Sequence, residues 1–98
     1  MSVKLAFLAT LEAKEGKGRE LDQFLKAGRE LAVAEEDTVT WYAFRIDETH
    51  FGIFDTFTNE EGRQAHIKGR VAEALHQAAS ELLAAESAIT PVDVVAVK

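Results

Sequence analysis

The sequence contains no cysteine, and basic residues are fewer than acidic ones. Disulfide bonds, thiol nucleophiles and thiolate metal sites are therefore excluded. Lysine and arginine together number 11, against 17 aspartate and glutamate residues. This balance disfavours a nucleic-acid partner, because phosphate binding requires a basic patch.

Segments that would direct the chain to a membrane or out of the cell are also missing. No apolar run approaches the roughly 20 residues that a helix needs to cross a bilayer. The start of the chain, from Met1 to Leu5, lacks the charged region and the small-residue cleavage site of a signal peptide. We therefore expect a soluble, cytoplasmic protein without a membrane partner.

Motifs for cofactors are absent too. The chain has no phosphate loop, no dinucleotide fingerprint, no nucleophile elbow and no zinc-ligand spacing. Its three histidines, His50, His66 and His76, are too scattered to indicate a metal site. We expect neither a metal nor any other cofactor.

The 98 residues that are present have the composition of one globular domain, which we expect to span residues 1–98. Alternating and β-branched or aromatic stretches predict strands, whereas apolar residues at three- and four-residue spacing predict helices. Strands are expected at 3–13, 38–46, 50–58 and 92–97, and helices at 19–36, 60–68 and 71–83. Thr58 or Asn59 is expected to cap the second helix, with Glu61 completing a capping box. Pro91 is expected to end the helical region.

This order of elements predicts an α+β fold of the ferredoxin-like, or split βαβ, type: an antiparallel four-stranded sheet with helices on one face. Every predicted strand nevertheless has apolar residues on both of its faces. One small subunit would leave a large apolar face exposed to water, which is unusual for a monomer. We therefore expect a homodimer that packs sheet against sheet.

Asp55 is the one charged residue on an apolar strand face that it shares with Phe51, Ile53 and Phe57. Burial of a carboxylate among apolar neighbours is a feature of functional sites. Asp55 is therefore a candidate catalytic residue. The alternative is a position near the sheet edge, where Asp55 would pair with an arginine such as Arg45 or Arg63.

His66 follows Phe57 by nine residues, on the helix that must return over the sheet. From there its imidazole could reach a cleft and transfer a proton near neutral pH, which makes it the candidate catalytic base. The alternative is a solvated helix residue near Arg63 and Arg70.

The aromatic residues of the two hairpin strands are the candidate binding surface for a small aromatic molecule. Core or dimer-interface positions are the alternative for Trp41, Tyr42, Phe44 and Phe54. The candidate substrate-binding residues are Trp41, Tyr42, Phe51 and Phe57.

Several segments, taken in order, resemble the antibiotic biosynthesis monooxygenase family, which includes quinol monooxygenases. Glu36-Asp37-Thr38 precedes the second strand where the family commonly has an acidic residue, proline and glycine, and Tyr42 lies where a strand tyrosine is common. The stretch FGIFDTFTNEEGRQAH resembles the family's strand-to-helix segment, with Asp55 at its acidic position, Phe57 at its tryptophan position and His66 at its histidine position. The closing PVDVVAVK resembles the final strand.

The resemblance covers nearly the whole chain and implies a dimeric α+β barrel. It also implies oxygen insertion into an electron-rich aromatic or quinol without flavin or metal. His66 would then be the base, and Tyr42 or Asp55 would orient the substrate or the base. Phe57 replaces the family's tryptophan, and the first strand offers Phe7 and no asparagine, which disfavours the haem-degrading branch.

Two further functions remain open from the sequence. One is a non-catalytic dimeric protein, associated with small-ligand binding or stress, that uses the same cleft. The other is an isomerase or decarboxylating enzyme on this scaffold, which would also use a histidine base.

Overall fold

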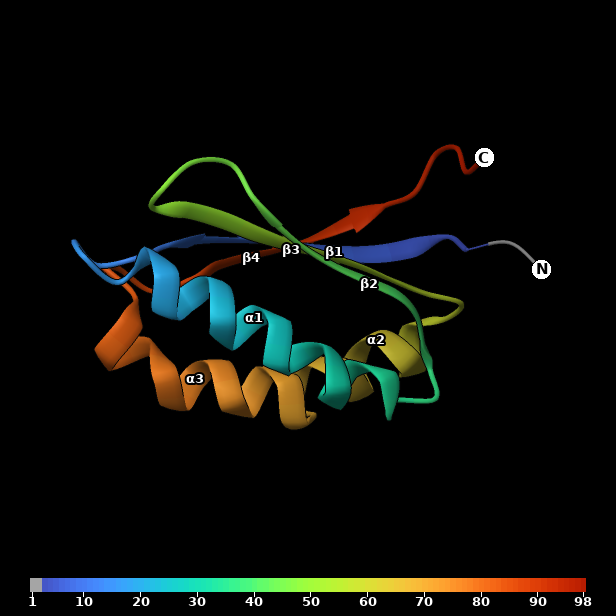
Figure 1. Ribbon diagram of the computed structural model, residues 1–98. Coiled ribbons are helices and arrows are strands. Elements are labelled where there is room, and N and C mark those ends of the chain that lie inside the picture. The colour runs from blue at the N-terminus through green and yellow to red at the C-terminus, as the bar shows by residue number, and fades with distance from the viewer. Residues whose placement is uncertain (1–2) are drawn as a thin grey trace.

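The computed structural model, which describes residues 3–98, is one antiparallel sheet with its helices packed on one face (Figure 1). The strands lie in the order β2-β3-β1-β4. This arrangement confirms the predicted α+β, ferredoxin-like fold. The elements are β1 (Leu5–Glu12), α1 (Gly18–Val33), β2 (Thr38–Arg45), β3 (His50–Phe57), α2 (Glu60–Ile67), α3 (Arg70–Leu82) and β4 (Ala88–Asp93).

The core lies between the sheet and the two long helices, α1 and α3. Each of these helices has an apolar stripe at helical spacing. Alternate residues of the central strands β1 and β3 point toward these two stripes. Burial of such stripes is the main source of stability for a domain of this size. The core residues are Ala9, Leu11, Ala13, Leu21, Leu25, Phe51, Ile53, Leu75, Leu82 and Leu83.

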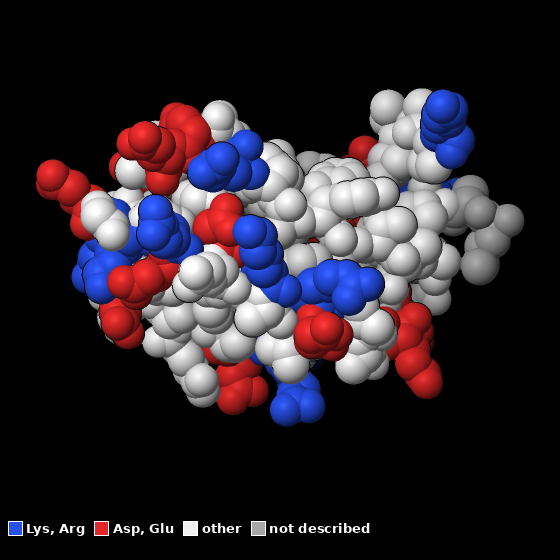
Figure 2. All heavy atoms as spheres, viewed as in Figure 1, with Lys and Arg blue, Asp and Glu red and all other residues white. Residues whose placement is uncertain are grey.

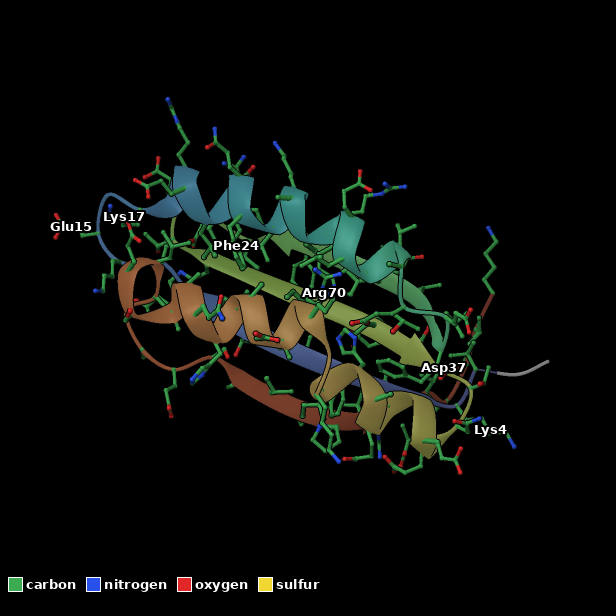
Figure 3. All side chains as sticks on the ribbon, turned by 90° about the horizontal axis from the view of Figure 1, so that it is seen from below. Lys4, Glu15, Lys17, Phe24, Asp37 and Arg70 are labelled. Carbon is green, nitrogen blue, oxygen red and sulfur yellow. The ribbon has the colours of Figure 1, made fainter. Side chains whose placement is uncertain are left out.

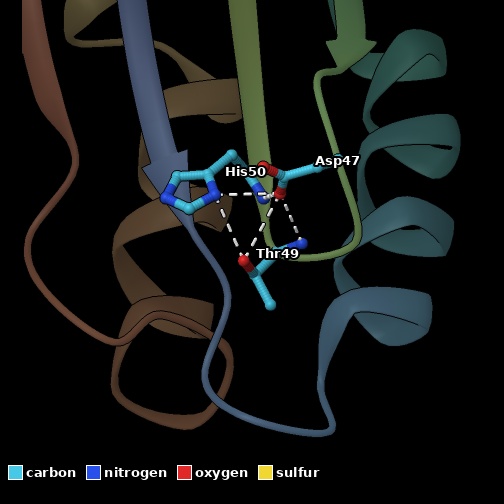
Figure 4. Close-up of polar contacts among 3 residues, drawn as sticks. All are labelled: Asp47, Thr49 and His50. Carbon is cyan, nitrogen blue, oxygen red and sulfur yellow. Dashed lines mark hydrogen bonds and ion pairs between the residues drawn. The ribbon is translucent and has the colours of Figure 1, made fainter.

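The turn between β2 and β3 is closed by the carboxylate of Asp47 (Figure 4). Its Oδ1 accepts hydrogen bonds from the backbone N–H groups of Thr49 and His50, at 3.0 and 2.8 Å. The backbone of Thr49 and then the side chain of His50 hold the pKa of Asp47 at about 2. This turn fixes the hairpin register, so that Trp41 on β2 lies directly opposite Asp55 on β3.

The sequence prediction of the last strand was wrong. Residues 92–97 were expected to form it, but β4 runs from Ala88 to Asp93 and includes Pro91. Proline lacks a backbone N–H, and β4 tolerates it because it is an edge strand that pairs only with β1. The cap of α2 is Asn59, whose Oδ1 accepts from the backbone N–H of Gly62 at 2.8 Å.

Acidic and basic side chains are intermixed on the face seen in Figure 2, with no continuous basic patch on that face. Among residues 3–98, the helices are all too short or too polar to cross a bilayer.

Candidate active site

Three side chains that are distant in the sequence meet at one end of the core. The imidazole of His66 lies between two carboxylates: Nε2 is 2.7 Å from Oδ2 of Asp55, and Nδ1 is 2.5 Å from Oε1 of Glu35. The hydroxyl of Thr38 also donates to Oε1 of Glu35, at 3.1 Å. We call Glu35, Asp55 and His66 the carboxylate–imidazole cluster.

Each member of the cluster is positioned by a different element. Asp55 lies on the central strand β3, on the face covered by the helices. His66 is in the last turn of α2, where exposed carbonyl groups favour a positive charge. Glu35 lies in the turn after α1, where its backbone N–H donates to the carbonyl of Ala32 at 3.0 Å.

The cluster packs directly against the backbone of Gly69. A Cβ atom at this position would lie 2.6 Å from Oε2 of Glu35, which is closer than any ordinary contact. The glycine between α2 and α3 therefore lets the two helices approach the turn that carries Glu35.

The cluster is almost inaccessible to water. Asp55 is 2% exposed and His66 is 8% exposed. Burial alone would lower the pKa of the imidazole, and this is the largest single effect. The hydrogen bond and charge of Asp55, together with those of Glu35, outweigh it and raise the pKa of His66. The two carboxylates thus favour the protonated imidazole, which donates from both nitrogens.

The cluster as a whole has one negative charge in excess, because two carboxylates share one imidazolium. Within residues 3–98, no lysine or arginine forms an ion pair with Glu35 or Asp55. An excess charge in a buried place favours uptake of a proton. In such a coupled group the proton belongs to the cluster rather than to one residue. The cluster can therefore accept a proton even though His66 itself has no free lone pair.

An apolar cavity of about 100 Å³ lies between the sheet and helices α1 and α3. Phe24, labelled in Figure 3, is one of its lining residues. Two other lining residues, Trp41 and Ile53, are neighbours of Asp55 on the same sheet face: Ile53 precedes it by two residues on β3, and Trp41 faces it on β2. Asp55 is thus adjacent to two lining residues without belonging to the lining itself.

A wider open groove of about 420 Å³ runs along α1 and the edge strand β2. Three of the predicted substrate-binding residues, Trp41, Tyr42 and Phe51, line it. Trp41 and Leu25 line both the groove and the cavity, so they form the wall between the two spaces.

Phe57, the fourth predicted substrate-binding residue, lies elsewhere. It is fully buried, and its ring centroid is 5.2 Å from that of His66. On its other side it packs edge-on against Phe7, at 5.9 Å. Phe57 therefore supports the imidazole and has no contact with the groove or the cavity.

The sequence identified two members of the cluster and missed the third. The surface alternative for His66 is wrong because the residue is buried. The edge alternative for Asp55 is wrong because β3 is a central strand and His66 is its partner. Glu35 was not singled out in the sequence, where it falls at the end of the helix expected at 19–36. The resemblance to a family with an acidic residue before the second strand pointed to Glu36, which is one position away.

A metal site is not evident in the part of the chain that the structure describes, where no three histidine or acidic side chains are placed to hold a metal ion. Sequence comparisons give no further guide, since no protein-family model and no curated protein matches the chain.

Solved structures do match. The NE2512 protein of unknown function from Nitrosomonas europaea is 42% identical, with 98% of this chain and 93% of that chain covered and a TM-score of 0.96. A candidate antibiotic biosynthesis monooxygenase from Nitrosomonas europaea is 11% identical, with 94% and 90% covered and a TM-score of 0.82. Another from Caulobacter crescentus is 15% identical, with 96% and 92% covered and a TM-score of 0.79. The last two likenesses establish a shared fold.

Proposed function

The chain belongs to the same family as the Nitrosomonas europaea protein NE2512 and has the antibiotic biosynthesis monooxygenase fold. From this premise we propose that it is a cofactor-independent monooxygenase of small hydroxylated aromatic compounds. The observation that carries the proposal is the position of the carboxylate–imidazole cluster. A buried proton acceptor with excess negative charge lies next to two lining residues of a small apolar cavity of about 100 Å³.

The reaction needs no external reductant. A hydroquinone and dioxygen contain the same atoms as a hydroxyquinone and water, so the substrate supplies every electron that dioxygen requires. Removal of one hydroxyl proton gives a phenolate, which passes an electron to dioxygen. The two resulting radicals combine at a ring carbon as a hydroperoxide. Loss of water from this hydroperoxide leaves the hydroxyquinone.

Each step assigns a task to residues of the chain. Asp55 and His66 are the catalytic residues of the proposal: the cluster accepts the hydroxyl proton through Asp55 and returns it to the oxygen that leaves as water. Glu35 holds His66 as an imidazolium, which balances the charge of Asp55. The apolar lining excludes water and so protects the radical pair. Trp41, Tyr42 and Phe51 bind the substrate along the groove and the cavity wall.

The proposed functional unit is a homodimer formed through the sheet face that lies opposite the helices. On this face Tyr42 is 59% exposed and Phe44 is 39% exposed. Phe54 and Leu8, which lie beside Tyr42 on the next two strands, are half-buried. Apolar side chains arranged in this way fit a second copy of the chain, which would cover them.

Oxygen uptake by the metal-free protein, with a panel of hydroquinones, tests the function. Mass analysis of the product after reaction with isotopically labelled dioxygen should show one labelled oxygen in the hydroxyquinone. Tight binding of these compounds without oxygen uptake would instead support the non-catalytic binding protein as the function. No binding and no uptake would refute both.

A further inference from the structure

Trp41 has a buried hydrogen-bond donor without an acceptor. Its indole Nε1 is inaccessible to water and has no partner. The benzo end of the same side chain packs against α1 in the wall of the apolar cavity. A Cβ atom, if Gly28 had one, would lie 3.7 Å from it. Since burial of an unpaired donor is costly, native proteins rarely retain one without a use.

Asp55 has the complementary feature, a buried acceptor without a donor. Its Oδ2 bonds to His66, but its Oδ1 is buried and has no donor. Asp55 and Trp41 are direct cross-strand neighbours on the sheet face that the helices cover. Cβ atoms of such neighbours lie about 4.5–5.5 Å apart. An acceptor without a donor and a donor without an acceptor therefore belong to two adjacent side chains, one of which lines the cavity.

A hydroxyl group satisfies both atoms at once, because it donates one hydrogen bond and accepts others. An ether oxygen could only accept from Trp41, and a hydrocarbon could do neither. A single water could also bridge the two atoms, but a buried water usually makes about three hydrogen bonds, and the rest of the lining is apolar. The volume of about 100 Å³ is below the roughly 150 Å³ of a cavity known to bind benzene. An enclosed group can therefore be no larger than one ring, and the wall must adjust to admit it.

We propose that Trp41 and Asp55 form a hydroxyl-binding pair that selects a single-ring phenol, with the phenolic O–H donating to Oδ1 of Asp55 and accepting from Nε1–H of Trp41. This inference deepens the proposed function and rests on it for the identity of the reacting oxygen. When the proton moves to Asp55, the indole N–H remains as the donor that stabilises the phenolate oxygen. Trp41 is then a specificity-determining residue of the site as well as part of its wall.

Binding without turnover tests the pair. Calorimetric titration of the unmodified protein with phenol, anisole and toluene should show phenol binding roughly 10- to 100-fold more tightly than anisole, because only phenol donates to the carboxylate. Trp41 is the sole tryptophan, so tryptophan-selective fluorescence should report the same order independently. Equal affinities for phenol and anisole would overturn the proposal.

Two variants separate the halves of the pair. Trp41→Phe keeps an apolar wall and removes the donor, so the preference for phenol over toluene should shrink. Asp55→Asn replaces the carboxylate with a neutral amide, whose oxygen is a weaker acceptor, so the preference for phenol over anisole should shrink. Asp93→Asn, the same change on an exposed strand residue, is the control and should leave the three affinities unchanged. Should Asp55→Asn fail to fold, the three-ligand comparison on the unmodified protein still decides the question.

The outcomes distinguish this proposal from the proposed function. Oxygen uptake together with equal phenol and anisole affinities would refute the hydroxyl-binding pair and leave the monooxygenase intact. A phenol preference without oxygen uptake would support the pair and refute the monooxygenase. A crystal structure of the phenol complex in which a retained water bridges Trp41 and Asp55, with the hydroxyl elsewhere, would also overturn the pair.

Discussion

The imidazole of His66 lies with its Nε2 only 2.7 Å from Oδ2 of Asp55, in a place that water hardly reaches. Its other nitrogen is equally occupied, by Glu35. A histidine with both N–H groups donated to carboxylates is not a free base. Any proton that a substrate loses here must be accepted by the cluster as a unit, which makes Glu35 as important to the chemistry as the two residues in contact.

The first prediction concerns stability and pH. The folded-state pKa of His66 is raised above its unfolded value of about 6.5, so the protonated ring stabilises the fold. This contribution is fully present below about pH 6.5 and is lost as the pH rises through the raised pKa. The free energy of unfolding, measured by urea denaturation at a series of pH values, should therefore decrease on the alkaline side.

The exposed His50 also has a raised pKa, because of Asp47, so its contribution must be removed. The measurement is best made on His50→Gln, in which the remaining alkaline decrease is expected to come from His66. Nitrogen chemical shifts of His66 should show that both ring nitrogens keep their protons to a higher pH than those of an unfolded histidine. A ring that loses its proton at or below about pH 6.5 in the folded protein would contradict the charge assigned to the cluster.

The second prediction concerns activity. Asp55→Asn should reduce the turnover of a hydroquinone by roughly 10² to 10⁴, the usual effect of losing a positioned acid–base group. Glu35→Gln should reduce it as well, because the imidazolium loses its second partner. If the cluster acts as one unit, the variant that combines Asp55→Asn with Glu35→Gln should turn over hydroquinone only slightly more slowly than the slower of the two single variants. Losses that multiply would show that Glu35 and Asp55 act independently.

The fold was largely predictable because local patterns and tertiary structure agree along most of the chain. The aromatic hairpin, the amphipathic stripe from Leu21 to Ala32 and the glycine at residue 69 each favour the structure that they form. The exception is the last strand. Pro91 is a strong helix breaker but a weak guide to strand limits, since only the sheet topology shows that β4 is an edge strand.

The site was less predictable because it depends on contacts between distant segments. Asp55 and His66 could be singled out as polar residues near apolar ones, but periodicity does not show that they touch. Glu35 gave no signal of its own, since it lies among three consecutive acidic residues at a helix end. The unpaired Nε1 of Trp41 is a property of packing, and no sequence pattern reveals it.

The third prediction concerns the homodimer. Tyr42→Glu places a charge on the exposed sheet face and should shift the protein toward monomers, because the interface must bury at least about 1,000 Å² to be stable. Val33→Glu is the matched control: Val33 is also exposed and apolar, but it lies at the end of α1 in the helix layer. Light scattering should report a dimer for the unmodified protein and for the control. A monomeric unmodified protein would refute the dimer.

The last prediction separates stability from ligand binding at Gly28. This glycine lies in the interior of α1 and lines the apolar cavity. Gly28→Ala should stabilise the protein by about 0.5–1 kcal/mol, because alanine is the better helix former and its methyl group would meet Trp41 at an ordinary contact distance of 3.7 Å. The same methyl group takes up part of a space of only about 100 Å³. Phenol affinity should therefore fall while the midpoint of urea denaturation rises. Opposite changes in the two measurements cannot come from general damage to the fold, which would lower both. If Gly28→Ala were more stable and bound phenol as tightly as the unmodified protein, the cavity would not be the ligand site, and the open groove along β2 would take its place.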